Sequence, residues 1–156
     1  MAFRSRMSIL VVEDDVSIRE TLGLILEACD HEPVLTGCAE EALAYLEACE
    51  QENWPESILV DLTLPGINGD EFFFEVGRRF PNVPPTILMT AAAPTHQKLK
   101  YLNGSLFLPK PFTLEELTAA LDTVTRTAPR KDKDPGLTCQ TDFSRSICLR
   151  PEAALI

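Results

Sequence analysis

A single acid, Asp61, follows a short apolar run and precedes a turn signal. The run, Ile-Leu-Val at 58–60, predicts a strand buried on both faces, and Pro65-Gly66 predicts the turn. An acid at the carboxyl end of a buried strand is costly unless that end opens into a polar crevice, where parallel α/β sheets place their ligand sites. The alternative is that Asp61 only caps the turn, a common role for aspartate.

Three further apolar runs end in residues that could do chemistry. Residues 8–12 run into Glu13-Asp14-Asp15, residues 86–90 end in Thr90, and residues 105–108 are followed by Lys110. If these strands are parallel, their carboxyl ends meet at one edge of the sheet. Residues far apart in the sequence would then converge around Asp61.

The carboxylates of Glu13, Asp14 and Asp61 would repel one another unless a cation lies among them. A set of oxygen ligands without histidine or cysteine favours Mg²⁺ or Mn²⁺ over zinc. With Lys110 and Thr90 nearby, this pocket could stabilise a phosphoryl group during its transfer to the Asp61 carboxylate.

The rest of the sequence supplies the elements that would position these groups. The strands are predicted at 8–12, 33–36, 58–62, 86–90 and 105–108, and the helices at 16–29, 39–50, 69–80, 95–103 and from 114 onward. This strict alternation predicts an α/β protein, a (βα)5 doubly wound five-stranded parallel sheet.

Local signals support the first and last helices. Asp15 suits the N-cap of the first helix, and Thr113-x-x-Glu116 forms a capping-box pattern before the last. The inner face of the first helix is predicted from helical spacing. It comprises Ile18, Leu22, Ile25 and Cys29.

The fourth helix is the weakest of the five. It has Leu99 and Leu102 as its only clear apolar anchors, Pro94 precedes it, and Asn103-Gly104 would end it. We therefore expect this helix to be short or mobile.

Composition limits the class of protein. The 156 residues favour one domain, and a formal net charge of -10 disfavours direct nucleic-acid binding. The apolar runs are too short for a membrane span or a signal peptide, so we expect a cytoplasmic protein that does not bind membranes. The five cysteines show no C-x-x-C spacing. His31 and His96 are expected to face solvent, since neither has a partner at metal-ligand spacing.

Four segments together resemble the receiver domain of bacterial two-component response regulators. The matching segments are ILVVEDD at 9–15, LVDLTLPGING at 59–69, LMTA at 88–91 and LPKPF at 108–112. The resemblance covers about residues 7–126 and implies the flavodoxin-like receiver fold.

The resemblance also implies roles for the acids. Asp61 would be the site of phosphorylation and would take its phosphoryl group from a phosphohistidine of a sensor histidine kinase or a histidine phosphotransfer protein. Asp14 and Asp61 would bind Mg²⁺ directly, Glu13 would act through water, and the Thr63 carbonyl would complete the shell.

The remaining implied roles concern the contacts of the phosphoryl group and the switch. Lys110, Thr90 and Ala91 would contact the phosphoryl group, and Thr90 would close onto phosphorylated Asp61. Phe107 occupies the position of the family's aromatic switch residue, although it could also be a plain core residue. The Lys110-Pro111 bond would be cis, which only X-Pro bonds adopt cheaply.

The implied domain organisation is simple. Residues 1–6 are expected to be a disordered extension, residues 7–127 the receiver domain, and residues 128–156 a mobile tail without an output domain. Such a receiver, as a monomer or weak homodimer, would signal through a downstream protein partner.

Two other classes of function stay open. One is a receiver-shaped interaction module that works without phosphorylation, although the acids, Thr90 and Lys110 disfavour it. The other is a phosphatase of the haloacid dehalogenase type, which would want a second acid two residues after the nucleophile, where this chain has Thr63. We therefore expect a phospho-accepting receiver rather than an enzyme that turns over substrate.

Overall fold

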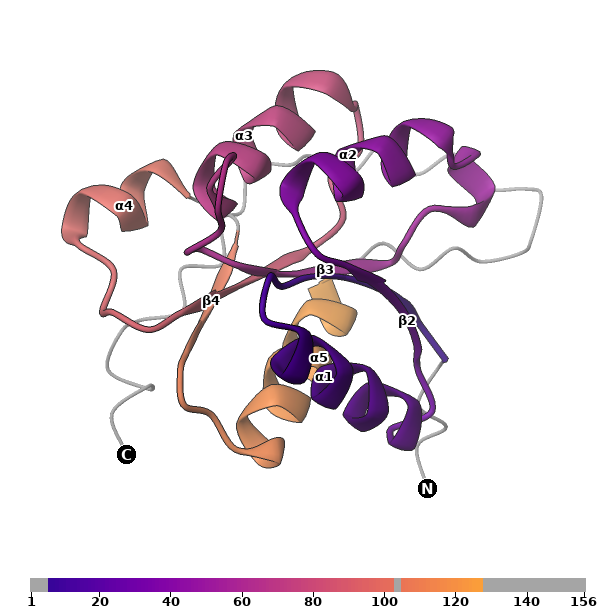
Figure 1. Cartoon of the computed structure of the whole chain (residues 1–156), viewed down its shortest axis with the longest axis vertical. Helices are drawn as coiled ribbons and strands as arrows, with labels where there is room; N and C mark the ends of the chain where they lie inside the picture. Colours follow the sequence, from indigo (N-terminus) through magenta and orange to yellow (C-terminus); the bar gives the residue numbers. More distant parts are fainter. Residues whose placement is uncertain (1–5, 103–104, 128–156) are drawn as a thin grey trace.

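The computed structural model describes residues 6–102 and 105–127, and its centre is a five-stranded parallel sheet. The strands are β1 (Ser8–Val12), β2 (Glu32–Thr36), β3 (Ser57–Asp61), β4 (Thr86–Thr90) and β5 (Leu106–Pro109). Their order across the sheet is β2-β1-β3-β4-β5, with every neighbouring pair parallel (Figure 1). The predicted doubly wound sheet is confirmed.

Helices alternate with the strands along the chain. They are α1 (Val16–Ala28), α2 (Ala39–Ala48), α3 (Gly69–Arg79), α4 (His96–Tyr101) and α5 (Leu114–Thr127), with a 3-10 turn, η1 (Gln51–Asn53), before β3. Figure 1 shows α2, α3 and α4 on one side of the sheet and α1 and α5 on the other.

Each face of the sheet has its own hydrophobic core. In β1, Leu10 and Val12 join the core beneath α2 and α3, whereas Ile9 and Val11 join the core beneath α1 and α5. Alternate side chains of a strand point to opposite faces, so a strand covered by helices on both faces is apolar through its middle. In β1, β3 and β4 the polar residues lie only at the strand ends. This explains why the strands appear in the sequence as continuous apolar runs.

The predicted caps of α1 and α5 are confirmed. The Asp15 carboxylate accepts a hydrogen bond from the Ile18 amide at 3.0 Å. At α5, Thr113 N donates to Glu116 Oε2 at 2.7 Å, and Glu116 N donates to Thr113 Oγ1 at 3.2 Å. Both caps satisfy amides that have no partner within the helix.

The predicted inner face of α1 is wrong in part. The structure buries Leu22, Gly23 and Leu26, whereas Ile18 is 39% exposed. A Cβ on Gly23 would lie 3.0 Å from Leu35 Cδ1 on β2. Because Gly23 has no side chain, α1 can pack closely against Leu35 of β2 at this point. The buried face of α1 is therefore centred on Leu22, Gly23 and Leu26 rather than on Ile18.

His31 is a second correction. It was expected to face solvent, but it is buried, and its Nδ1 accepts a hydrogen bond from the Met7 amide at 3.4 Å. An imidazole can replace water as a partner for a backbone amide at the start of a strand, so this histidine has a structural role.

The expectation of a short fourth helix is confirmed. α4 has six residues, and those from 96 to 100 are all exposed. Leu102, immediately after the helix, is buried in the core beneath α2 and α3. Among the side chains described at 96–100 and 102, only that of Leu102 is deeply buried, and it anchors this segment at its carboxyl end.

The predicted tail at 128–156, most of the predicted extension at 1–5, and the Asn103-Gly104 helix end lie outside the described residues. Arg6, also assigned to the extension, forms an ion pair with Glu32 at 2.9 Å. None of the helices within residues 6–102 and 105–127 is long and apolar enough to cross a membrane.

Candidate functional site at the carboxyl edge of the sheet

Strand register brings the predicted site residues to one edge. Val12 pairs with Val60, so Glu13 and Asp61 follow at the same level. Thr90 pairs with Pro109, so Lys110 follows directly on the neighbouring strand. The predicted convergence at the carboxyl ends of the strands is therefore seen.

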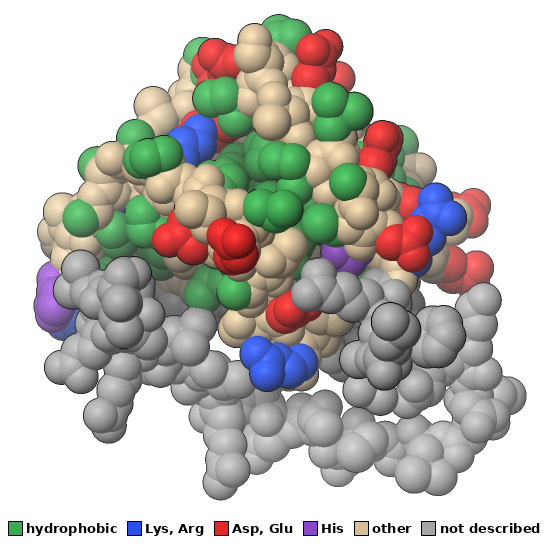
Figure 2. All heavy atoms as spheres, turned by 90° about the horizontal axis from the view of Figure 1, so that it is seen from below, with side chains coloured by type: hydrophobic (Ala, Val, Ile, Leu, Met, Phe, Trp, Pro, Cys, Tyr) green, Lys and Arg blue, Asp and Glu red, His purple; other side chains and the backbone are tan. Residues whose placement is uncertain are grey.

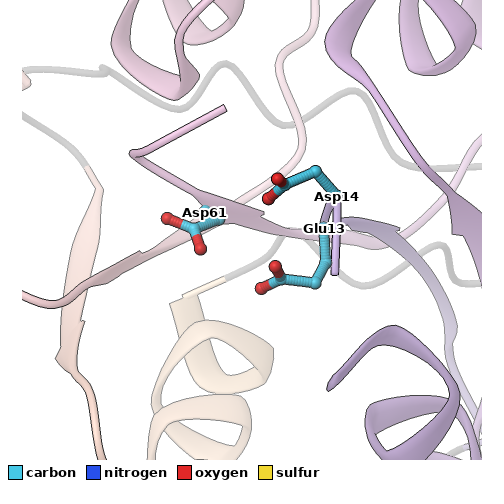
Figure 3. Close-up of side chains that lie close together, drawn as sticks. All are labelled: Glu13, Asp14 and Asp61. Carbon is cyan, nitrogen blue, oxygen red and sulfur yellow. The ribbon is translucent and has the colours of Figure 1, made fainter. Parts of the chain in front are cut away.

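The acids form one cluster. Glu13, Asp14 and Asp61 each place a carboxylate oxygen within 4.8 Å of the others. Glu13 and Asp61 are buried, whereas Asp14 is exposed. Figure 3 shows Glu13 and Asp14 turning their carboxylates toward the side on which Asp61 lies. The cluster therefore has two acids in the sheet edge and one facing solvent.

Lys110 lies between the two buried acids. Its Nζ donates to Glu13 Oε2 at 2.8 Å and also to Asp61 Oδ2. The side chain of Lys110 is 18% exposed, and those of Glu13 and Asp61 are 1% and 8% exposed. Because screening by water is weak at such sites, the ammonium is a strong local charge next to the Asp61 carboxylate.

Burial and pairing shift two of these groups. Burial raises the pKa of Glu13 above its usual value, and the hydrogen bonds from Lys110 and the Asp15 amide oppose that shift without cancelling it. Burial alone would lower the pKa of Lys110, but its hydrogen bonds to Asp61 and Glu13 outweigh that effect and raise the pKa. Lys110 therefore stays cationic, and the raised pKa means that Glu13 ionises less readily than an ordinary glutamate.

The loop from β3 to α3 holds the other oxygen of Asp61. Thr63 N donates to Asp61 Oδ1 at 2.7 Å, so one carboxylate oxygen faces the loop and the other faces Lys110. Thr63 is exposed. The side chain of Asp61 is thus oriented from both sides.

Gly69 is a site residue to which the sequence analysis gave no role. A Cβ at Gly69 would overlap the Asp61 carbonyl oxygen and lie 2.7 Å from Leu62 Cα. The Gly69 amide also donates to Leu62 O at 3.2 Å. The first residue of α3 therefore packs directly on the backbone of Asp61. The signals in the sequence are a glycine at a helix start, where no capping argument requires one, and its place at the end of the matching segment at 59–69.

Thr90 is buried at the end of β4 but does not contact Asp61 by a hydrogen bond in this structure. Its Oγ1 donates to Ala92 O at 2.6 Å and accepts from Ala92 N at 3.2 Å. The neighbouring Ala91 is exposed. The Thr90 hydroxyl is therefore held within its own loop.

Phe107 and Pro111 lie on either side of Lys110 along the chain. Phe107 is half-buried and packs against the core beneath α2 and α3. The Lys110-Pro111 peptide is cis, as the resemblance implied. The Lys110 amide donates to Thr90 O at 2.7 Å, which joins this turn to the end of β4.

Residues 9–122 match the family described as the response regulator receiver domain. The chain belongs to this family. Among curated relatives, it is 34% identical over 123 residues to the phosphate regulon transcriptional regulatory protein PhoB of Escherichia coli, covering 76% of this chain and 51% of PhoB. It is also 34% identical over 127 residues to the response regulator ArlR of Staphylococcus haemolyticus, covering 80% of this chain and 55% of ArlR. The chain thus spans about half the length of these relatives.

Solved receiver structures share the fold. The chemotaxis protein CheY4 of Vibrio cholerae superposes with a TM-score of 0.67 at 24% identity, covering 77% of this chain and 99% of that one. The response regulator TrrA of Thermotoga maritima, solved in complex with Mg²⁺-BeF, gives a TM-score of 0.65 at 25% identity, covering 76% and 98%. The predicted receiver fold is confirmed, and the family is consistent with two-component signalling.

The donor set of this receiver fits a hard divalent cation. Every ligand of the cluster is an oxygen, which suits Mg²⁺ or Mn²⁺. Within residues 6–102 and 105–127, the one ammonium paired with the buried acids is that of Lys110, so three carboxylates face a single positive charge from the described part of the chain. A divalent cation would balance the remaining two.

Proposed function

We propose that this receiver accepts a phosphoryl group on Asp61 from the phosphohistidine of a sensor histidine kinase or a histidine phosphotransfer protein. In this reaction the phosphorus–nitrogen bond of phosphohistidine breaks, and a bond forms between phosphorus and a carboxylate oxygen of Asp61. The electron pair of the broken bond stays on the imidazole. The observation that carries the proposal is the Asp61 carboxylate, which pairs with Lys110 and lies within the cluster that it forms with Glu13 and Asp14.

Asp14 and Asp61 would hold the Mg²⁺ directly, with Glu13 acting through water and the Thr63 carbonyl as a further ligand. The ion would supply positive charge that offsets the negative charge of the incoming phosphoryl oxygens. The response regulator TrrA, which shares this fold, was solved in complex with Mg²⁺-BeF, and this supports a Mg²⁺ site in the present chain by similarity.

Lys110 would move its hydrogen bond from Asp61 Oδ2 to a phosphoryl oxygen. This exchange costs little, because the ammonium keeps an anionic partner before and after transfer. Glu13 remains its second partner at 2.8 Å, so the ammonium stays oriented.

The loop after β4 would report the modification. The Thr90 hydroxyl would leave Ala92 for the phosphoryl group, and the Ala91 amide would provide a further contact. We assign the aromatic switch to Phe107, which lies next to Leu88 across the sheet. The protein would then signal as a two-state switch to a downstream protein partner rather than turn over substrate.

The surface near the site offers contacts for the phosphohistidine partner. Figure 2 views the side on which Figure 1 places α1 and α5, and hydrophobic side chains reach the surface there among acidic ones. Val16 at the start of α1 and Leu114 at the start of α5 are 54% and 53% exposed. Both follow strand ends that carry site residues, so a partner bound there would be adjacent to Asp61.

Incubation with acetyl phosphate and Mg²⁺ tests the proposal. We expect intact-mass spectrometry to show the addition of one phosphoryl group, which Asp61→Asn abolishes. Asp70→Asn is the matched control, because it removes the same charge from the first turn of α3 outside the cluster. An unmodified parent protein would instead support a module that works without phosphorylation, and steady turnover of phosphate esters would support a phosphatase.

A further inference from the structure

Arg19, in the first turn of α1, contacts the loop that carries two of the three acids. Its Nη1 donates to the carbonyl oxygen of Glu13 at 2.7 Å and to that of Asp14 at 3.3 Å. These are the residues that follow β1 and precede the N-cap of α1. The guanidinium therefore binds the backbone of the acidic loop rather than its carboxylates.

The Glu13 residue is held on both sides of its backbone. Its amide donates to Thr36 O on β2 at 3.1 Å, and its carbonyl accepts from Arg19. One of its carboxylate oxygens accepts from the Asp15 amide at 3.2 Å, and the other accepts from Lys110. With the carbonyl oxygens bound to Arg19, the loop is held in the conformation that brings the Glu13 and Asp14 carboxylates to Asp61.

The chain leaves room for this guanidinium at Gly37. A Cβ on Gly37 would lie 3.2 Å from Arg19 Nη1 and 3.6 Å from its Cζ. Any side chain at Gly37 would therefore crowd the position that Arg19 occupies. The segment after β2 and the first turn of α1 thus fit together around the arginine.

We propose that Arg19 is a positioning residue for the divalent cation, acting through the carbonyl groups of Glu13 and Asp14. This inference rests on the proposed cation site, and it assigns to α1 a part in forming that site. Groups that orient metal ligands without touching the metal commonly change metal affinity by about tenfold or more when removed. Arg19 meets this description, because its two hydrogen bonds end on the residues that carry the ligands.

The test is Mg²⁺ binding by titration calorimetry together with amide hydrogen exchange in EDTA. We expect Arg19→Ala to weaken Mg²⁺ binding about tenfold and to speed exchange of the Glu13 amide in the metal-free protein. Arg126→Ala is the matched control, because Arg126 also donates to a backbone carbonyl, that of Asp122 at 3.3 Å, but at the far end of α5. It removes the same charge and should leave both readouts unchanged.

Arg19→Lys keeps the charge and a donor on a shorter side chain, so its Mg²⁺ affinity should fall between those of the parent and Arg19→Ala. It also serves as the test variant if Arg19→Ala fails to fold. With acetyl phosphate, the Mg²⁺ concentration needed for half-maximal labelling should rise in Arg19→Ala, while labelling at saturating Mg²⁺ is retained.

Equal Mg²⁺ affinity in the parent and both Arg19 variants would overturn the proposal. So would a loss of labelling at saturating Mg²⁺ with unchanged Mg²⁺ binding, because that would place Arg19 in the transfer step instead. A parent protein that binds Mg²⁺ but is never labelled would contradict the phosphorylation proposal alone, since the binding comparison between variants would still stand.

Discussion

Two regions at the carboxyl edge of the sheet are held in different ways: the ends of β1, β3 and β5, and the segment from β4 to α4. At the ends of β1, β3 and β5, Lys110 bonds to two buried acids from two strands, and Gly69 packs on the backbone of Asp61. In the segment from β4 to α4, the hydroxyl of Thr90 donates to Ala92 O within its own loop, and α4 is a six-residue helix exposed over residues 96–100.

This difference separates the groups that would perform the chemistry from those that would report it. Preorganised charges must not move when the phosphoryl group arrives, and contacts between different strands keep them in place. A segment that responds must have a second conformation available at small cost. Few buried side chains and local hydrogen bonds meet that requirement.

The largest expected effect on stability is at Gly69, which packs on the end of β3. Gly69→Ala should lower the free energy of unfolding by about 4 kcal/mol, because the new Cβ would overlap the backbone of Asp61 and Leu62, which cannot shift without displacing β3. Urea denaturation measures the change.

Gly77→Ala, in the same helix, is the control for that variant. A Cβ there meets nothing closer than Val83 Cγ2 at 4.0 Å, so alanine should stabilise the protein by about 0.5–1 kcal/mol through helix propensity. Similar effects of the two substitutions would show that Gly69 is not a close contact between α3 and the site.

The second prediction compares the ion pairs of Lys110 in the acidic cluster with the ion pair of Lys98 on α4. Lys110→Met should destabilise the metal-free protein by about 2–3 kcal/mol, because it leaves two buried carboxylates without their cation. Lys98→Met removes the pair between α4 and Asp70, which spans 3.6 Å with Lys98 51% exposed, and should cost less than about 1 kcal/mol.

Thermal unfolding in EDTA and in Mg²⁺ checks this pair of variants. Mg²⁺ should recover more of the lost stability in Lys110→Met than in Lys98→Met, since the ion supplies charge only at the acidic cluster. Equal losses of stability in the two variants in EDTA would show that Lys110 is not needed to stabilise the buried acids.

The smallest expected effect concerns pH. Because burial holds the pKa of Glu13 above its usual 4.5, protons compete with Mg²⁺ at a higher pH than for an ordinary glutamate. Mg²⁺ affinity should therefore fall as the pH is lowered toward that raised pKa, and calorimetric titrations across mildly acidic pH measure the decline.

Glu13→Gln is the control for the pH experiment. It should bind Mg²⁺ more weakly, and its affinity should decline less as the pH falls, because the group that titrates has been removed. If parent and variant have parallel pH profiles, another group controls the dependence and the raised pKa of Glu13 has no part in it.

Much of the fold could be predicted because the strands and caps are local signals. The apolar runs before Glu13, Asp61 and Lys110 predict buried parallel strands, and parallel strands bring their carboxyl ends together. The inner face of α1 and the burial of His31 could not be predicted, because each depends on a distant neighbour. Because Gly23 has no side chain, Leu35 of β2 can pack against α1, and the His31 imidazole accepts a hydrogen bond from the Met7 amide.

The sequence by itself determined which residues form the acidic cluster and the edge of the sheet at which they meet. Residue type and position after a strand are enough for that inference. Only the tertiary structure decided how those groups are held: Lys110 shared between two acids, Thr90 bound to Ala92, Gly69 packed on Asp61, and Arg19 bound to two carbonyl groups. Contacts of this kind depend on distances between elements, and hydrophobic periodicity carries no information about those distances.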